Sequence, residues 1–417
     1  MSQDLTAKGR SPSLLGGAMI IAGTTVGAGM FTLPVMTSGM WFFYSLLILA
    51  LTWLLMYSSS LLILEANLNY PIGASFDTMT EDLLGHGGRI ITGALVAFVL
   101  YILTYAYISG GGSTTALTLG NLLGIPVLYQ VGGLLFGGVL ALIVYLSTKA
   151  VDRITTIMLG AMVITFFMSV AGLIYNIKLP VLLNNSDPTA HYAPYILIAI
   201  PVCLASFGYH GNIPSLMKYY GKAPKKIACA ALLGSLMALF FYFLWQLSAL
   251  GNLPRDTFRG IMAAGGNMDV LLAALGQTVK QSHLNILLQI FANLAVASSF
   301  LGVTLGLFDY IADLFKFDDS HLGRLKTAVI TFAPPLIGAM IWPNGFLLAI
   351  GFAALAAAGW AVIIPVLLAI KSRRKFGNPQ FRTPGGRLTL VIVFGYGVLV
   401  ILCHLLGLFG LLPQFGA

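Results

Sequence analysis

The chain has 417 residues, of which 58% are hydrophobic and only 8% are charged. An ordinary globular protein carries about 25% charged residues, so this chain lacks the polar surface that keeps a soluble fold dispersed. Its formal net charge of +9 would point to nucleic acid in a soluble protein, but here the positions of the charges matter more than their sum. The composition excludes a soluble enzyme or nucleic-acid-binding protein and indicates a polytopic membrane protein.

The first apolar run follows a polar start and continues through a whole span length, with no small-residue cleavage site behind a short core. It is therefore expected to be a retained first span and not a signal peptide. The cysteines Cys203, Cys229 and Cys403 are far apart and lie in or beside apolar runs. Their spacing is typical of neither a metal site nor a disulfide framework.

Eleven segments are long and apolar enough to cross a bilayer as helices, which takes about 20 residues each. Because the apolar runs are unbroken and show little alternation, an outer-membrane barrel is excluded. The chain is expected to be all-α and to form one transmembrane domain over residues 1–417. The expected spans are 13–38, 41–64, 89–112, 130–148, 154–177, 193–217, 227–250, 284–308, 325–342, 346–370 and 388–411.

Lysine and arginine lie mostly on one side of these spans. If the N-terminus is cytoplasmic, all but four of the 22 basic residues lie inside, the exceptions being Lys178, Arg255, Arg259 and Lys280. Since cytoplasmic loops carry an excess of Lys and Arg, the N-terminus is predicted to be cytoplasmic and the C-terminus to lie outside. The outer loop 251–283 contains a stretch from Asn267 to Lys280 that suits a helix, either a lid over the bundle or a solvated loop helix.

Two of the spans contain residues that break helices. Span 1 reads GGAMIIAGTTVGAGMFTLP, and span 6 reads PVCLASFGYHGNIPSL. Glycine costs about 1 kcal/mol inside a helix and proline about 3 kcal/mol, so both spans are expected to unwind near mid-membrane. Unwound backbone in a membrane must be buried in protein or line a watery cavity. The alternative is close helix packing through small residues.

The two expected breaks lie five spans apart and run in opposite directions across the membrane. That arrangement is typical of secondary transporters built from inverted repeats, which bind substrate at the midplane between broken helices. The repeats would cover residues 13–177 and 193–370, with 388–411 as an extra helix. A half-helix that begins at Ala28–Gly29 would direct free N–H groups at a carboxylate.

Long strings of the chain resemble the hydroxy and aromatic amino acid permease family, most closely its bacterial tryptophan-specific members. The strings are SPSLLGGAMIIAGTTVGAGMFTLPV, LEANLNYPIGASFDT, FVLYILTYAYISG, FGYHGNIPSLMKYYG and SSFLGVTLGLFDYIADLF, and the likeness runs from about Ser11 to the last span. It implies a LeuT-type fold of five plus five helices with an eleventh added. It also implies proton-coupled import of an aromatic amino acid, tryptophan first, across the bacterial inner membrane.

The resemblance also implies which residues bind the substrate. The span 1 break would hold its carboxylate and ammonium, and the span 6 break would line the other side. Backbone N–H groups suit the carboxylate, while freed carbonyls and threonine hydroxyls near residues 23–25 suit the ammonium. The residues carried over are Thr24, Thr25, Gly27, Ala28, Gly29, Phe207, Gly208, Tyr209 and His210.

Further candidates come from spans 3 and 8. Tyr101 and Tyr105 share one helical face and could stack against an aromatic ring, or they could simply pack. Asn293 lies at about mid-depth of span 8, before Ser298 and Ser299. In sodium-coupled proteins of this fold class such hydroxyls form a sodium site, whereas the alternative is a bond to a carbonyl of their own helix.

The proton-coupling group is expected to be His210 or Glu65. His210 is the only histidine in an expected break, and an intramembrane imidazole titrates near neutral pH. Its alternative role is structural, as a neutral ring that holds the unwound segment in shape. Glu65 ends span 2 near the cytoplasmic surface and is the second candidate. No Asp or Glu lies at mid-membrane.

Two other functional classes lack their usual marks. The sequence has no GxxxxGKS/T, HExxH or GxSxG motif and no acidic metal cluster, so neither an enzyme nor a cofactor or metal is expected. It also lacks the charged rings and repeated filter loops of channels. The expected partners are an aromatic amino acid, a proton and membrane lipids, and not nucleic acid. Tyrosine or phenylalanine as substrate, sodium as coupling ion and the oligomeric state stay open.

Overall fold

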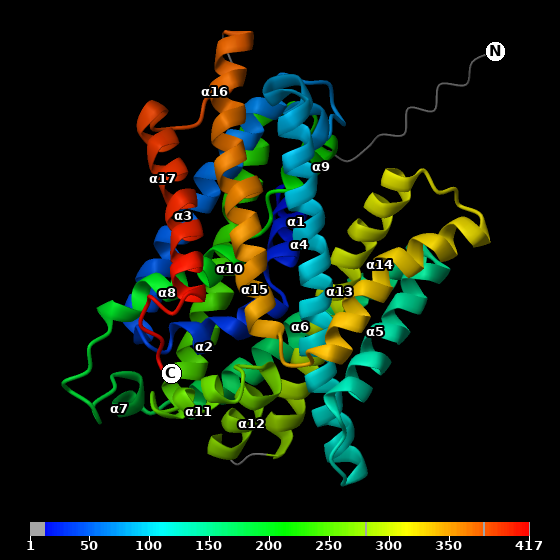
Figure 1. Cartoon of the computed structure of the whole chain (residues 1–417). Coiled ribbons are helices and arrows are strands. Elements are labelled where there is room, and N and C mark those ends of the chain that lie inside the picture. The colour runs from blue at the N-terminus through cyan, green and yellow to red at the C-terminus, as the bar shows by residue number, and fades with distance from the viewer. Residues whose placement is uncertain (1–12, 280–281, 378–379, 417) are drawn as a thin grey trace.

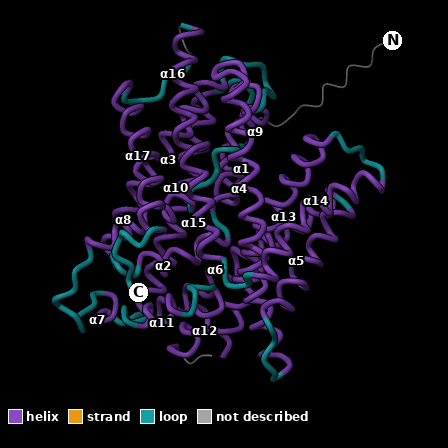
Figure 2. Tube along the Cα trace, in the orientation of Figure 1, coloured by secondary structure: helices purple, strands orange, loops and turns teal. Residues whose placement is uncertain are grey.

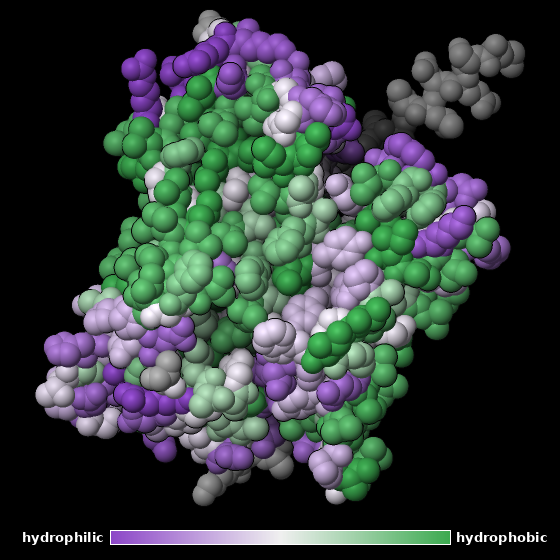
Figure 3. Space-filling view, viewed as in Figure 1, coloured by the Kyte–Doolittle hydropathy of each residue, from purple (hydrophilic) through white to green (hydrophobic). Residues whose placement is uncertain are grey.

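The structure is a computed structural model and describes residues 13–279, 282–377 and 380–416. Every regular element among these residues is helical (Figure 2). Within the described ranges, nine helices are long and apolar enough to cross a membrane, and one bent pair would make ten. Hydrophobic side chains cover the middle of the visible face, between polar groups at its two ends (Figure 3). The expectation of an all-α polytopic membrane protein is thus confirmed.

The first half of the chain runs from α1 to α7. A short connection separates the first break from α3, and α4 is the longest element of this half. The elements are α1 (Leu14–Thr25), η1 (Ala28–Phe31), α2 (Thr32–Thr37), α3 (Trp41–Asn67), α4 (Phe76–Leu123), α5 (Tyr129–Leu146), α6 (Thr148–Tyr175) and α7 (Leu179–Leu182).

The second half begins with short helices and ends with α17 near the marked C-terminus (Figure 1). Its elements are η2 (Ala193–Tyr195), α8 (Ile196–Ala205), α9 (Asn212–Tyr220), α10 (Pro224–Asn252), α11 (Thr257–Ala263), α12 (Met268–Val279), α13 (Ser282–Phe315), α14 (His321–Ile341), α15 (Phe346–Ala357), η3 (Ala358–Ile363), α16 (Ile364–Phe376) and α17 (Gly386–Leu408).

The first expected break lies between α1 and η1. Helix α1 is capped by the Ser13 hydroxyl and ends where Val26 turns to extended backbone. Gly27 is also extended, with φ −166°. The helices on either side, Leu14–Thr25 and Ala28–Thr37, meet at an angle of 53°. A short helical segment, η1 followed by α2, begins at Ala28.

The second expected break lies between α8 and α9. Helix α8 ends at Ala205 and α9 begins at Asn212, so six residues of irregular backbone interrupt the segment. The segment 193–217 therefore consists of short helices around irregular backbone, at the place where its glycines and prolines lead us to expect unwinding. This segment is also missing from the nine long apolar helices found in the described residues.

The stretch between the expected spans 41–64 and 89–112, which we expected to be a loop over 70–88, is partly helical. Helix α4 begins already at Phe76, where the Ser75 hydroxyl accepts the N–H of Thr78, and it bends at Gly85, whose φ is +77°. The polar composition of this stretch hid the helix. The expected helix in the outer loop is confirmed as α12, and the predicted end of that stretch at Lys280 lies outside the described residues.

The breaks lie at the centre of the bundle, between α10 and α13. Helix α1 packs against α10, where a side chain at Gly234 would collide with the Ala18 carbonyl and with Ile21. Small residues let membrane helices approach this closely. Helix α13 packs against α4 and α6, and its Ser299 reaches the first break.

Opposite ends of the bundle are held by different charged groups. At the end where α3 and α16 finish, Glu65 is 1% exposed and forms a two-point ion pair with Arg373, at 2.6 and 2.9 Å. At the end that carries α11 and α12 (Figure 1), Arg255 donates to the carbonyls of Ser38 and Gly39. Its guanidinium lies 4.3 Å from the ring centre of Phe415, a favourable cation–π contact.

Candidate functional site

The two breaks are joined to each other by hydrogen bonds. The Asn212 amide donates to the Thr24 hydroxyl at 2.6 Å. The Tyr242 hydroxyl, which comes from α10, lies 2.7 Å from the Thr25 carbonyl and 2.5 Å from the Ser206 carbonyl. A single buried hydroxyl therefore connects the end of α1 with the end of α8.

Ser299 of α13 serves the other side of the first break. The Ala28 N–H donates to the Ser299 hydroxyl at 3.2 Å. The Ser299 side chain also interacts with Tyr107 of α4. The neighbouring Ser298 instead donates to Ala295 of its own helix at 3.2 Å. Of the two serines considered from sequence, only Ser299 is hydrogen-bonded to the break in the described residues.

The hydroxyls of Thr24 and Thr25, which were expected to bind the substrate, form hydrogen bonds within α1. Thr24 donates to the Ile20 carbonyl at 2.8 Å, and Thr25 donates to the Ile21 carbonyl at 2.6 Å. Thr24 and the glycines Gly208 and Gly211 of the second break are nevertheless exposed. Beside Gly29 there is open space, since no neighbouring atom lies within 4 Å of the position a side chain would take. Both breaks therefore carry exposed residues, and the backbone beside Gly29 is not covered by a neighbouring side chain.

The second break carries three aromatic residues that are almost wholly buried. Phe207 packs edge-on against Tyr242, with ring centres 5.4 Å apart. The Tyr209 hydroxyl lies 3.3 Å from the Ser60 hydroxyl, and its ring stacks on His210 at 5.1 Å. Together these side chains fix the irregular backbone against α3 and α10.

His210 is completely buried but its ring nitrogens are not satisfied. Among the described residues neither nitrogen has a hydrogen-bond partner. The Met56 carbonyl faces the ring, but the geometry falls short of a hydrogen bond. Trp360 packs edge-on at 6.3 Å. The Met56 carbonyl of α3 is the acceptor that the alternative, structural role of this ring would use.

Three of the sequence candidates form contacts away from the breaks. The hydroxyls of Tyr101 and Tyr105 donate to the carbonyls of Ile330 and Trp342, at 3.0 and 2.7 Å. The Asn293 side chain bonds to Thr114 and Thr118 of α4. These residues join α4 to α13, α14 and the turn after α14. Within the described part of the chain, no hydrogen bond links them to either break.

Sequence reasoning missed two residues of the site. Tyr107 is offset from Tyr101 and Tyr105 around the helix, and this offset turns it toward Ser299. The spacing was visible, but the direction in which α4 faces was not. Tyr242 lies in a plain apolar span, so no local pattern marks it.

An aromatic cluster lies just beyond the first break, in the direction of α11 and α12. Phe31, Trp245 and Phe291 are fully buried, and their ring centres lie 5.2 to 5.9 Å apart. They come from η1, α10 and α13. Because aromatic rings bury large apolar areas, this cluster seals the bundle on that side of the breaks.

Glu65, the second proton-coupling candidate, lies five residues further along α3 than Ser60, which contacts Tyr209 of the second break. Besides the ion pair with Arg373, its carboxylate accepts the N–H of Thr383 at 2.8 Å. Nearby, the Tyr70 hydroxyl donates to Asp82 at 2.6 Å, and burial, followed by this bond, raises the pKa of Tyr70. Glu65 thus belongs to a polar cluster that joins α3, α16 and the segment before α17.

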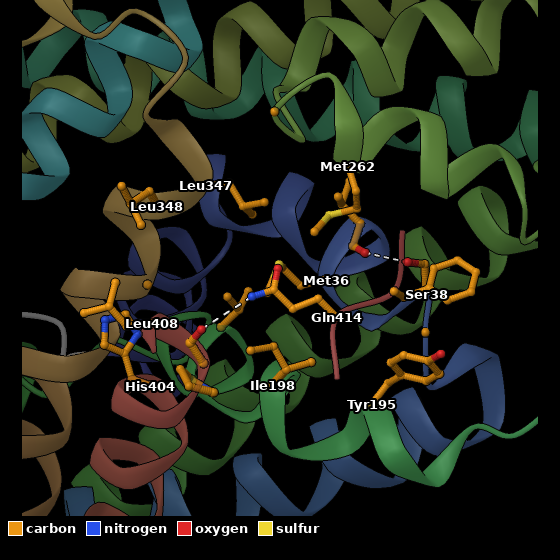
Figure 4. Close-up of a pocket in the computed structure, with 18 of the residues that line it drawn as sticks. Met36, Ser38, Tyr195, Ile198, Met262, Leu347, Leu348, His404, Leu408 and Gln414 are labelled. Carbon is orange, nitrogen blue, oxygen red and sulfur yellow. Dashed lines mark hydrogen bonds between the residues drawn. The ribbon is translucent and has the colours of Figure 1, made fainter. Parts of the chain in front are cut away.

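A cavity of about 430 Å³ lies near the C-terminal end of the chain. Its wall includes Met36, Ile198, Leu347 and His404, from α2, α8, α15 and α17, and Gln414 reaches across it (Figure 4). None of the residues predicted from sequence to bind substrate lines it. The cavity is distinct from the space at the breaks.

Comparison with solved structures shows what the fold resembles. A manganese transporter of Eremococcus coleocola superposes with a TM-score of 0.60 at 15% identity, over 99% of this chain and 91% of that one. At this identity the likeness concerns the fold alone. The chain therefore has the fold of a known membrane transporter.

Comparison with other sequences shows the family. The chain is 56% identical to a tryptophan-specific transport protein of Pseudomonas aeruginosa, over 97% of each chain. It is 40% identical to a tyrosine permease of Enterobacter agglomerans, over 99% of this chain and 100% of that one. The model of the tryptophan/tyrosine permease family matches residues 10–404. The chain is a transporter, not an enzyme, and belongs to the tryptophan/tyrosine permease family.

Proposed function

We propose that this protein imports L-tryptophan by proton symport, with alternating access to a site between its two broken helices. The observation that carries the proposal is the junction of the breaks through Tyr242, which lies within 2.7 Å of a carbonyl from each. The high identity to a tryptophan-specific transport protein supports tryptophan as the substrate.

Backbone groups at the breaks suit the two charged ends of an amino acid. The N–H groups that begin η1, around Gly27 to Gly29, take the carboxylate at the positive end of the helix dipole. The carbonyls of Thr25 and Ser206 take the ammonium, because both end a helix and point at one position. The buried aromatic residues Phe207 and Tyr209 line the second break and face the ring of the substrate.

The proposed architecture is the LeuT-type inverted repeat in a bacterial inner membrane. One repeat covers residues 13–177, the second covers 193–370, and α17 is the additional eleventh helix. Breaks near residues 26–27 and 206–211, one in each repeat, support this assignment. The N-terminus lies in the cytoplasm and the C-terminus in the periplasm, as the distribution of Lys and Arg favours.

We assign the described conformation to the inward-facing state. Thr24, Gly208 and Gly211 are exposed, whereas the cluster of Phe31, Trp245 and Phe291 is fully buried on the side of α11 and α12. The breaks are then accessible from the cytoplasm and sealed from the periplasm. Alternating access requires the reverse in the second state.

His210 is the preferred proton carrier. Its imidazole is buried beside the proposed substrate site, and because burial disfavours a charged ring, it would take up a proton in the conformation that admits water to it. Glu65 is held by Arg373 and Thr383, and releasing it would leave the half-buried Arg373 without its partner. A carboxylate held in this way is suited to fixing helices and not to carrying protons in each cycle.

The deciding experiment is uptake of labelled tryptophan into sodium-free proteoliposomes with an inward proton gradient. Accumulation is expected, and a protonophore should abolish it. Unlabelled tryptophan should compete better than tyrosine or phenylalanine. Equal competition by tyrosine would favour the specificity of the tyrosine permease relative, and absence of any saturable uptake would contradict the proposal.

Sodium symport is the second candidate, and one contact favours it. The Ser299 hydroxyl reaches the first break, where hydroxyls and freed carbonyls could together coordinate a hard cation. Uptake that begins only when sodium is added, and that is lost in Ser299→Ala, would establish this alternative. The other candidate, Ser298, donates to a carbonyl of its own helix instead, so the sodium site would lack one of the two expected hydroxyls.

A further inference from the structure

Tyr242 brings one hydroxyl proton to two backbone acceptors. Its side chain is completely buried, and its hydroxyl lies 2.7 Å from the Thr25 carbonyl and 2.5 Å from the Ser206 carbonyl. A phenol can donate only one hydrogen bond at a time. The two carbonyls therefore share a single donor and keep unused capacity to accept hydrogen bonds.

Ser299 plays the complementary part on the other side of the break. Its hydroxyl accepts the Ala28 N–H at 3.2 Å, so it occupies a donor that would otherwise face the open space beside Gly29. Both hydroxyls come from helices that pack against the breaks, α10 and α13. Side-chain hydroxyls thus satisfy groups that the helix breaks expose.

We propose that the hydroxyls of Tyr242 and Ser299 stand in for the ammonium and carboxylate of the substrate when the carrier is empty, and that tryptophan displaces them. This inference rests on the proposed function, which places those two charged groups at the same backbone atoms. Tyr242 is a positioning residue in this scheme, since it acts on the carbonyls that bind the substrate.

The replacement of the substrate's charged groups by these hydroxyls matters when the carrier returns without substrate. A symporter must return empty after it releases its substrate, and during the return the site closes without a ligand. A buried acceptor without a donor is costly, so the return is slow unless something replaces the ammonium. In exchange, by contrast, the carrier crosses loaded in both directions and needs no replacement.

The test is Tyr242→Phe, which removes the hydroxyl and keeps the ring that packs on Phe207. Tryptophan should bind about tenfold more tightly, because it no longer competes with the hydroxyl, and proton-driven net uptake should slow about tenfold. A factor of ten corresponds to about 1.4 kcal/mol, within the cost of a buried unpaired acceptor. Exchange of labelled for unlabelled tryptophan at equal pH and saturating tryptophan should fall clearly less than net uptake, so the ratio of exchange to net uptake should rise.

Tyr396→Phe is the matched control. Tyr396 is a buried tyrosine of α17 whose hydroxyl lies 3.1 Å from Thr52, away from both breaks. The Tyr396→Phe substitution should change neither tryptophan binding nor the ratio of exchange to net uptake. Ser299→Ala provides the second variant, and it should reproduce the tighter binding and the slow net uptake even if Tyr242→Phe folds poorly.

The outcomes separate this inference from the function on which it rests. If the unsubstituted protein neither binds nor exchanges tryptophan, the proposed function fails and the stand-in role fails with it. If the unsubstituted protein is active, but in both variants binding weakens or exchange falls in step with net uptake, only the stand-in role is overturned.

Discussion

A completely buried imidazole without a hydrogen-bond partner in the described residues, as at His210, needs an explanation because such groups are costly. Proton transfer provides one. His210→Asn should abolish accumulation of tryptophan against its gradient, since an amide does not titrate, while exchange at equal pH persists. Transport into proteoliposomes with and without a proton gradient measures both quantities.

His404→Asn is the control for this prediction. Its Nε2 is also buried without a partner in the part of the chain that the structure describes, but it lies in α17 beside the separate cavity. His404→Asn should still accumulate tryptophan against its gradient. Loss of tryptophan binding in His210→Asn would show that the ring shapes the site and does not carry the proton.

Glu65 is expected to behave differently from a proton carrier. In Glu65→Gln the half-buried Arg373 loses its charged partner, the buried carboxylate of Glu65, and breaking a buried pair costs about 3 kcal/mol or more. The melting temperature in detergent should fall clearly. In Asp313→Asn, which breaks the exposed pair with Lys316, it should barely move. A stable Glu65→Gln that loses only proton-driven accumulation would instead make Glu65 the carrier.

At the scale of elements, the fit between α13 and the first break depends on the absence of a side chain at Gly27. Its extended φ is open to any residue, so the restriction is steric: a methyl group there would collide with the Ser299 hydroxyl. Gly27→Ala should therefore lower tryptophan uptake at least about tenfold, since overpacking costs about 1–3 kcal/mol. Uptake at equal protein amounts in the membrane measures the effect.

Gly302→Ala is the control on the same helix, because nothing lies within 4 Å of the new methyl group. It should transport normally. Equal losses in the two variants would mean that α13 tolerates no added methyl group, whether or not it faces the break.

Helix α12 is tied to the bundle by side chains at its start. The Tyr129 hydroxyl of α5 donates to Asp269 at 2.5 Å, and Asn267 donates to Asn344 at 3.0 Å. Tyr129→Phe leaves a buried carboxylate without this donor, so backbone amides of α12 should exchange hydrogen about tenfold faster. Tyr175→Phe, at an exposed position, should leave the rate unchanged; unchanged exchange in both would show that Tyr129 does not hold α12.

The presence of most membrane-spanning helices could be predicted from the sequence, because a span requires an unbroken apolar run of sufficient length. The start of η1 at Ala28 and the presence of α12 followed from glycine placement and apolar spacing. The early start of α4 at Phe76 did not, because a polar stretch can be helical when a cap such as Ser75 begins it. The division of segment 193–217 needed tertiary contacts to fix its ends.

At the scale of the whole molecule, the distribution of Lys and Arg predicts which end faces the cytoplasm. Cysteines introduced at Ser186 and at Lys222, both exposed, would lie on opposite sides. An impermeant maleimide should label Ser186→Cys in cells whose outer membrane alone is opened, and Lys222→Cys only after the inner membrane is opened. The reverse pattern would invert the proposed topology. Because Cys203 and Cys403 are buried and Cys229 is half-buried, the unsubstituted protein is the background.

The candidate site shows where sequence reasoning ends. Backbone groups at Thr25 and Ala28 could be anticipated, since helix breakers reveal which carbonyls and N–H groups are freed. The residue that joins the breaks could not, because Tyr242 sits in an unremarkable span and acquires its role only when α10 packs beside both. Tyr101 and Tyr105 had the right chemistry on a helix face that turns toward α14.

The stacking of Phe415 on Arg255 has a practical consequence for anyone who handles this carrier. Arg255 holds the carbonyls that follow α2, and Phe415 covers it. A fluorescent protein or affinity tag fused directly behind Phe415 would pull on the ring that covers Arg255. A label inserted in the exposed stretch around Ser186 would leave that contact undisturbed.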